Sequence, residues 1–239
     1  MAETYVLIPG AWHGGWAWRP VAQRLRAAGH RVVSLTMPGL ADGSDPRGLV
    51  LGDAVAHVVG EVTRLDLRDV TLVAHSWGGM PMTGAAHQLT DRVRKLVYWS
   101  AFVPDGTHSL IEEVPNEFEQ LFTQVAVASG DNTVTLPYEV WSQGFIQDAE
   151  PEVRRLVYEL LVPQPMGYFT EALGTPEIQT LGIPATYLIS TDDLVFPPGE
   201  YGWVPRFPDR LGVEPTEVPG SHESMLTQPA ELAEAILKA

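Results

Sequence analysis

The sequence contains no cysteine, few cationic residues and no long apolar run. Without cysteine the chain cannot form disulfides, thiolate metal sites or a thiol nucleophile. The 15 Lys and Arg residues against 30 Asp and Glu residues leave a net charge of −15, which disfavours nucleic acid or an anionic membrane as partner. No segment has the roughly 18 uninterrupted apolar residues of a membrane helix, and the first residues lack the pattern of a secretory signal peptide. We therefore expect a cytoplasmic protein that binds neither nucleic acid nor membranes.

Short apolar runs alternate with helical patterns along the 239 residues, which predicts an α/β fold with a mainly parallel sheet covered on both faces. Strands are expected at residues 5–8, 31–36, 70–74, 95–99, 185–190 and 214–218. Helices are expected at residues 21–28, 51–64, 78–89 and 229–238.

The segment from residue 104 to residue 176 interrupts this alternation. It contains no clear strand, two helical patterns at residues 117–128 and 152–161, and several prolines. We interpret residues 104–176 as a helical cap inserted into a core made of residues 1–103 and 177–239. Nothing in the sequence indicates an oligomeric state.

The run Val70–Met80 reads as a buried strand that leads directly into a helix through a serine. The form is small-x-Ser-x-Gly, with Ala74 where glycine is more usual, Ser76 in the centre and Gly78 after it. Such a turn is so tight that the residues two before and two after the serine must be small. The pattern predicts that Ser76 is displayed as a nucleophile.

Two later strand ends supply the groups that a nucleophilic serine requires. A serine hydroxyl needs a base whose pKa lies near neutrality, and His222 follows the last expected strand. A carboxylate must orient that imidazole, and the strand before it ends in Asp192 and Asp193. We favour Asp193, because the spacing Asp-x-x-Phe-Pro matches the usual pattern after this strand, and keep Asp192 as the alternative.

Two backbone N–H groups are expected to form the oxyanion hole, which stabilises the negative charge on the reacting carbonyl oxygen. One belongs to Trp77, the residue after the nucleophile, and the other to Ala11 in the Gly-rich turn after the first strand. Trp12 and Trp141 are the expected substrate contacts. His13 and His75 are assigned packing or loop-holding roles.

These motifs together resemble one branch of the α/β-hydrolase superfamily. The likeness rests on Leu7–Trp18, Ala74–Gly79, Thr191–Pro197 and Gly220–His222. The branch contains plant methylesterases, hydroxynitrile lyases, the salicylate-binding esterase and bacterial pyrethroid-type carboxylesterases. The resemblance implies a Ser-His-Asp triad and an oxyanion hole at the positions above, with no metal or organic cofactor.

Two departures bear on the reaction. The lyases carry Thr and Lys where this chain has Gly10 and Glu223, and a carboxylate at residue 223 would repel cyanide. We therefore predict hydrolysis of a small, largely apolar or aromatic carboxylic ester through an acyl-enzyme. The alternatives are a non-hydrolytic reaction on the same scaffold, such as a lyase or natural-product tailoring step, and a ligand-binding pseudoenzyme.

Overall fold

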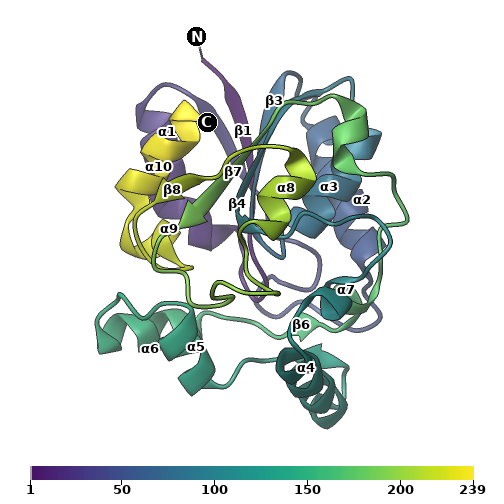
Figure 1. The fold of residues 1–239 in the computed structure, drawn as a ribbon, viewed down its shortest axis with the longest axis vertical. Coiled ribbons are helices and arrows are strands. Elements are labelled where there is room, and N and C mark those ends of the chain that lie inside the picture. Colours follow the sequence, from purple (N-terminus) through teal and green to yellow (C-terminus); the bar gives the residue numbers. More distant parts are fainter. Residues whose placement is uncertain (1) are drawn as a thin grey trace.

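The computed structural model describes residues 2–239, and its centre is a six-stranded parallel sheet with helices on both faces (Figure 1). The strand order is β2-β1-β3-β4-β7-β8. The fold class expected from the sequence is thereby confirmed. The strands are β1 (Thr4–Ile8), β2 (Arg31–Ser34), β3 (Val70–Ser76), β4 (Val93–Ala101), β7 (Ala185–Ser190) and β8 (Thr216–Val218).

Alternate residues of the central strands supply two separate apolar cores, because successive side chains of a strand point to opposite faces. Leu72 and Ala74 face one core, while Val73 between them faces the other. The first core is covered by α2 (Leu51–Arg64), α3 (Gly79–Gln88) and α8 (Arg206–Leu211), and the second by α1 (Arg19–Ala27) and α10 (Pro229–Lys238). Both faces are buried, so the strands read as continuous apolar runs.

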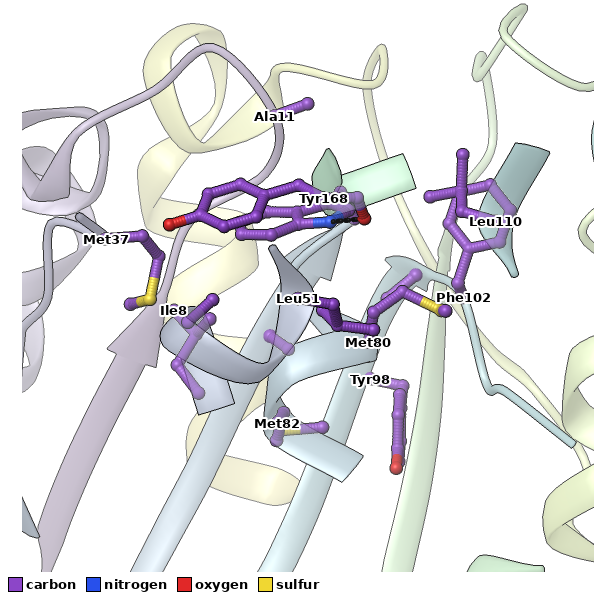
Figure 2. Packing of buried hydrophobic residues seen from close by; sticks show 14 of the residues in the cluster. Ile8, Ala11, Met37, Leu51, Met80, Met82, Tyr98, Phe102, Leu110 and Tyr168 are labelled. Carbon is purple, nitrogen blue, oxygen red and sulfur yellow. Dashed lines mark hydrogen bonds between the residues drawn. The ribbon is translucent and has the colours of Figure 1, made fainter. Parts of the chain in front are cut away.

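The larger of these two cores extends from the sheet to the segment that follows β4. Figure 2 shows Tyr98 and Met82 within this core, with Tyr168 and Ala11 at its other end. Tyr98 and Met82 are fully buried. The core therefore joins the sheet to the loops at its carboxyl end.

Residues 104–176 lie across the carboxyl end of the sheet (Figure 1). The expected helices are present as α4 (Asn116–Ser129) and α6 (Pro151–Glu159). The short helix α5 (Tyr138–Gly144) and the two-residue strands β5 (Thr133–Val134) and β6 (Gln164–Pro165) were not predicted, because elements this short leave little periodicity. The other elements of this segment are η2 (Leu110–Glu113) and α7 (Gly167–Thr170).

The remaining short elements lie in loops outside residues 104–176. They are η1 (Gly15–Trp18), η3 (Ile178–Leu181) and α9 (Ser224–Thr227). Among residues 2–239, no helix combines the length and apolar character needed to cross a bilayer.

Gly79 marks the closest backbone approach between α3 and the end of β4. A Cβ atom at this position would lie 1.9 Å from the carbonyl oxygen of Phe102. We expect Gly79→Ala to lower the free energy of unfolding by about 3 kcal/mol or more, since backbone must move to admit the methyl group.

Urea unfolding followed by circular dichroism measures this effect, with Gly60→Ala as the control. Gly60 is exposed within α2 and its Cβ would meet nothing within 4 Å. This substitution should stabilise the protein by roughly 0.5–1 kcal/mol. Equal stabilities of the two variants would contradict the described packing.

Candidate functional site

Ser76 lies at the sharp turn between β3 and α3. Its φ is +52°, a left-handed conformation that non-glycine residues rarely adopt. A Cβ atom at Gly78 would lie 2.5 Å from the carbonyl oxygen of Pro9, so a larger residue there is excluded. The turn therefore brings Ser76 to the carboxyl end of the sheet next to the loop that follows β1.

Trp77, the residue after Ser76, and Ala11, in the loop after β1, carry the two backbone N–H groups expected to form the oxyanion hole. Both residues line the same pocket as the serine. Neither N–H donates a hydrogen bond to another group within the described part of the chain. The two groups are thus available to an oxygen atom bound beside Ser76.

His222 and Asp193 form a buried pair at the ends of β8 and β7. The Nδ1 atom of His222 lies 2.6 Å from Oδ2 of Asp193, and the side chains are 1% and 2% exposed. The loops are joined by a backbone hydrogen bond from the Asp192 N–H to the carbonyl of Gly220. Asp192 itself is exposed, so its carboxylate does not take the place beside His222.

Three aromatic rings surround the imidazole of His222. Trp203 stacks on it at 5.6 Å between centroids and 15° between planes, and Phe145 meets it edge-on at 5.4 Å. The ring of His75 lies 4.4 Å away. The Nε2 atom of His222 is buried and has no hydrogen-bond partner among residues 2–239. Proton transfer with a hydroxyl at Ser76 requires this free nitrogen.

Ser76 lines an apolar pocket of about 360 Å³, a volume that includes the open space at its mouth. Trp12 contributes to its wall, as expected. Trp141 does not line the pocket: it is fully buried and stacks on Phe145, with 5.4 Å between the ring centroids. Phenylalanines not predicted from the sequence form much of the wall. The lining residues are Ala11, Trp12, Ser76, Trp77, Phe102, Leu110, Val114, Phe118, Phe122, Phe145, Phe169, Val195 and Phe196.

Trp12 also joins the loop after β1 to residues 104–176. Its backbone N–H donates to Oε1 of Gln164 at 2.9 Å, and its indole N–H donates to the carbonyl of Val134 at 2.8 Å. Its own carbonyl accepts from the N–H of Val162 at 3.0 Å. Trp12 has a φ of +66°, so these three bonds hold a conformation that the residue seldom adopts.

Glu223 is directed away from the pocket and faces His13. The two side chains are each 1% exposed, with Oε2 and Nε2 3.4 Å apart. Burial raises the pKa of Glu223 well above its ordinary value and so favours the uncharged carboxyl group. Repulsion of an anion by this residue, expected from the sequence, loses support, because Glu223 does not line the pocket and burial favours its uncharged form.

Burial also favours the neutral form of both neighbouring histidines. It lowers the pKa of His13 to about 4 and the pKa of His75 well below its ordinary value. His75 stacks on Trp99 with 4.3 Å between ring centroids. It therefore has the packing role expected from the sequence, although it also contacts His222.

One group of side chains outside the pocket has the residue types of a metal site. Asp105, His108 and Glu113 each place one ligand atom within 4.8 Å of the others. However, Arg210 lies 2.6 Å from Glu113, and His108 is bonded to Asp105 at 2.6 Å. These partners already satisfy much of the ligand capacity, so the cluster is a poor match to a cation.

Comparison with known proteins shows similarity along the whole chain. A model of the alpha/beta hydrolase family matches residues 5–235. The carbendazim hydrolyzing esterase of Nocardioides sp. (strain SG-4G) is 31% identical over 98% of this chain and 98% of its own length. Salicylic acid-binding protein 2 of Nicotiana tabacum is 29% identical over 99% of this chain and 96% of its own length.

A solved structure of an extracellular alpha/beta-hydrolase from a Paenibacillus species has the same fold, with a TM-score of 0.94 and 32% identity. The match covers 99% of this chain and 98% of that chain. That hydrolase is described as sharing structural and functional homology with tobacco salicylic acid binding protein 2.

Proposed function

Because this chain belongs to the alpha/beta hydrolase family, we propose that it hydrolyses carboxylic esters with Ser76 as nucleophile, His222 as base and Asp193 as the group that orients the base. The observation that carries the proposal is the buried contact of 2.6 Å between His222 and Asp193 beside an apolar pocket that ends on a strained serine. The similarity to esterases over nearly the whole chain supports the same reaction class.

In the first half of the reaction, Oγ of Ser76 attacks the ester carbonyl carbon while Nε2 of His222 accepts the hydroxyl proton. The carbonyl oxygen becomes negatively charged and is stabilised by the N–H groups of Ala11 and Trp77, each worth about 3 kcal/mol. The tetrahedral intermediate collapses when His222 returns the proton to the departing alcohol oxygen. An acyl group then remains on Ser76.

In the second half of the reaction, water is the nucleophile and Ser76 is the leaving group. His222 removes a proton from water, whose oxygen attacks the acyl carbonyl. The second tetrahedral intermediate expels Oγ of Ser76, which regains its proton from His222. Asp193 accepts the Nδ1–H bond throughout, so the imidazole keeps the tautomer with a free Nε2 and its positive charge is stabilised.

The pocket supports a small, uncharged, apolar or aromatic ester as substrate. Its wall consists of aromatic and aliphatic side chains and contains no ionisable residue. Transferring a charged group into such surroundings is costly, whereas aromatic rings gain contact area. We further propose that residues 104–176 act as the cap of this pocket, because Phe118, Phe122 and Phe169 of this segment line it.

Two measurements test the proposed reaction. We expect a burst of p-nitrophenol from p-nitrophenyl acetate, equal to the enzyme concentration, because acylation precedes slower hydrolysis of the acyl-enzyme. A serine-directed phosphonate should attach once per chain, and peptide mass spectrometry should locate it on Ser76. Absence of labelling in the folded protein, or labelling elsewhere, would refute the nucleophile.

A further inference from the structure

Two buried polar side chains behind the pocket have no part in the reaction described above. His13 belongs to the loop after β1 that carries the Ala11 N–H, and Glu223 directly follows His222. Each is 1% exposed, and Nε2 of His13 lies 3.4 Å from Oε2 of Glu223. Both atoms are buried and neither makes a hydrogen bond within residues 2–239, so their mutual contact is a close approach without hydrogen-bond geometry. A buried polar atom without a partner is costly, so this contact needs an explanation.

His13 binds the carbonyl group of Ala11 from the other side of its ring. Nδ1 of His13 lies 2.7 Å from this oxygen, which can only accept, so Nδ1 carries the proton of the neutral imidazole. Nε2 is then an acceptor, and Oε2 of Glu223, 3.4 Å away, can donate to it when the carboxyl group is protonated. The two side chains therefore match as donor and acceptor. Together they form a series of contacts from Glu223 through His13 to the Ala11 carbonyl.

The peptide group between Ala11 and Trp12 is held at both ends. Its carbonyl accepts from His13, and its N–H donates to Oε1 of Gln164 at 2.9 Å. This peptide group directly follows the Ala11 N–H along the chain. Fixing this plane leaves only φ and ψ of Ala11 to orient the preceding peptide group, and so restricts the directions that the Ala11 N–H can take.

The surroundings of Glu223 favour its protonated form. The carboxylates of Asp193 and Asp148 disfavour a further negative charge, in addition to burial. His13 faces His222 and His75, and a charge on His13 is disfavoured by burial and by His222. Proton sharing between a neutral acid and a neutral imidazole is thus compatible with every titratable group around the pair.

We propose that Glu223 and His13 are positioning residues for the oxyanion hole: Glu223 donates to His13, and His13 holds the Ala11 carbonyl so that the Ala11 N–H points at the reacting oxygen. The proposal rests on the ester-hydrolase function above. It links the loop of the base with the loop of the oxyanion hole, since Glu223 is adjacent to His222.

The test compares Glu223→Gln with Glu223→Leu in steady-state ester hydrolysis. Glutamine retains an N–H donor to His13, so kcat should stay within about threefold of the wild type. Leucine removes the donor, and kcat should fall roughly 10- to 100-fold with KM changed less than threefold, because an oxyanion hole acts mainly in the transition state. Tyr98→Phe is the matched control: it removes a buried hydrogen bond to Thr83, away from the pocket, and should leave kcat unchanged.

Should Glu223→Leu not fold, His13→Phe applies the same test with a planar ring in the same space and should also lower kcat roughly 10- to 100-fold. An unchanged kcat in either folded variant, or an equal loss in Glu223→Gln, would overturn the positioning role. If the wild-type protein neither hydrolyses esters nor reacts with the phosphonate, the proposed function fails instead, and the two failures are distinguishable.

A second readout addresses the donor role of Glu223. A carboxyl group with a raised pKa in the folded state holds a proton that the unfolded chain releases above about pH 4.5, so its contribution to stability falls as pH rises. The Tm of Glu223→Gln minus that of the wild type should therefore increase as the pH is raised from 5 to 8. A difference that does not vary with pH would overturn the protonated donor.

Discussion

Replacing Ser76 by alanine should lower kcat for ester hydrolysis by about 10⁶-fold, the loss measured where a triad serine has been removed from a serine protease. Without Oγ no acyl-enzyme forms, and only binding and the Ala11 and Trp77 N–H groups remain to assist direct attack by water. KM for a neutral aryl ester should change little. The pocket wall is apolar, and the methyl group of alanine occupies part of the space of the serine side chain.

The rate is measured with p-nitrophenyl esters on protein purified in a host free of the wild-type gene. Ser142→Ala serves as the control, because Ser142 is a buried serine of α5 that does not line the pocket. Its kcat should be within twofold of the wild type. More than 1% residual activity in Ser76→Ala would place the nucleophile elsewhere.

Replacing Asp193 by asparagine should lower kcat by about 10⁴-fold, the size of effect known for the same exchange in a serine protease. Oδ1 of Asp193 accepts the N–H of Val195 at 3.0 Å, and Oδ2 accepts from His222. The single oxygen of asparagine would remain with Val195, so its NH₂ group would face Nδ1. His222 would then carry its proton on Nε2 and could not accept the proton of Ser76.

Asp192→Asn is the matched control, because Asp192 is the neighbouring carboxylate and is exposed. It should retain kcat within about threefold. Both variants should remain folded and bind the serine-directed phosphonate in the pocket. Pre-steady-state kinetics would assign the loss in Asp193→Asn to the acylation step. The reverse order of effects would identify Asp192 as the acid.

The residues that form local motifs were predictable from the sequence. The small residues around Ser76 follow from the tightness of its turn. Ser76, Asp193 and His222 lie at or after the ends of parallel strands, and these ends share one edge of the sheet, so their meeting there could be expected. Asp193 could be preferred over Asp192 only by pattern. In the structure the preference has a physical basis, since one carboxylate is buried beside His222 and the other is exposed.

The pocket wall and the support behind it were not predictable in the same way. Phe122 and Trp203 come from segments separated by 81 residues and meet the site only after folding, so no spacing rule relates them to Ser76. Trp141 was an expected substrate contact, but it packs against Phe145 and does not line the pocket. Glu223 was interpreted as a charge, because its burial cannot be read from a sequence.

The three hydrogen bonds of Trp12 have a consequence for protein engineering. They tie the loop of the Ala11 N–H to three separate points of residues 104–176, at Val134, Val162 and Gln164. A segment transplanted from a relative to change substrate range would have to supply two carbonyl-type acceptors and one N–H donor at these points. A graft chosen only for the shape of its pocket wall would leave the indole and backbone of Trp12 without partners, and would lose turnover before its specificity could be measured.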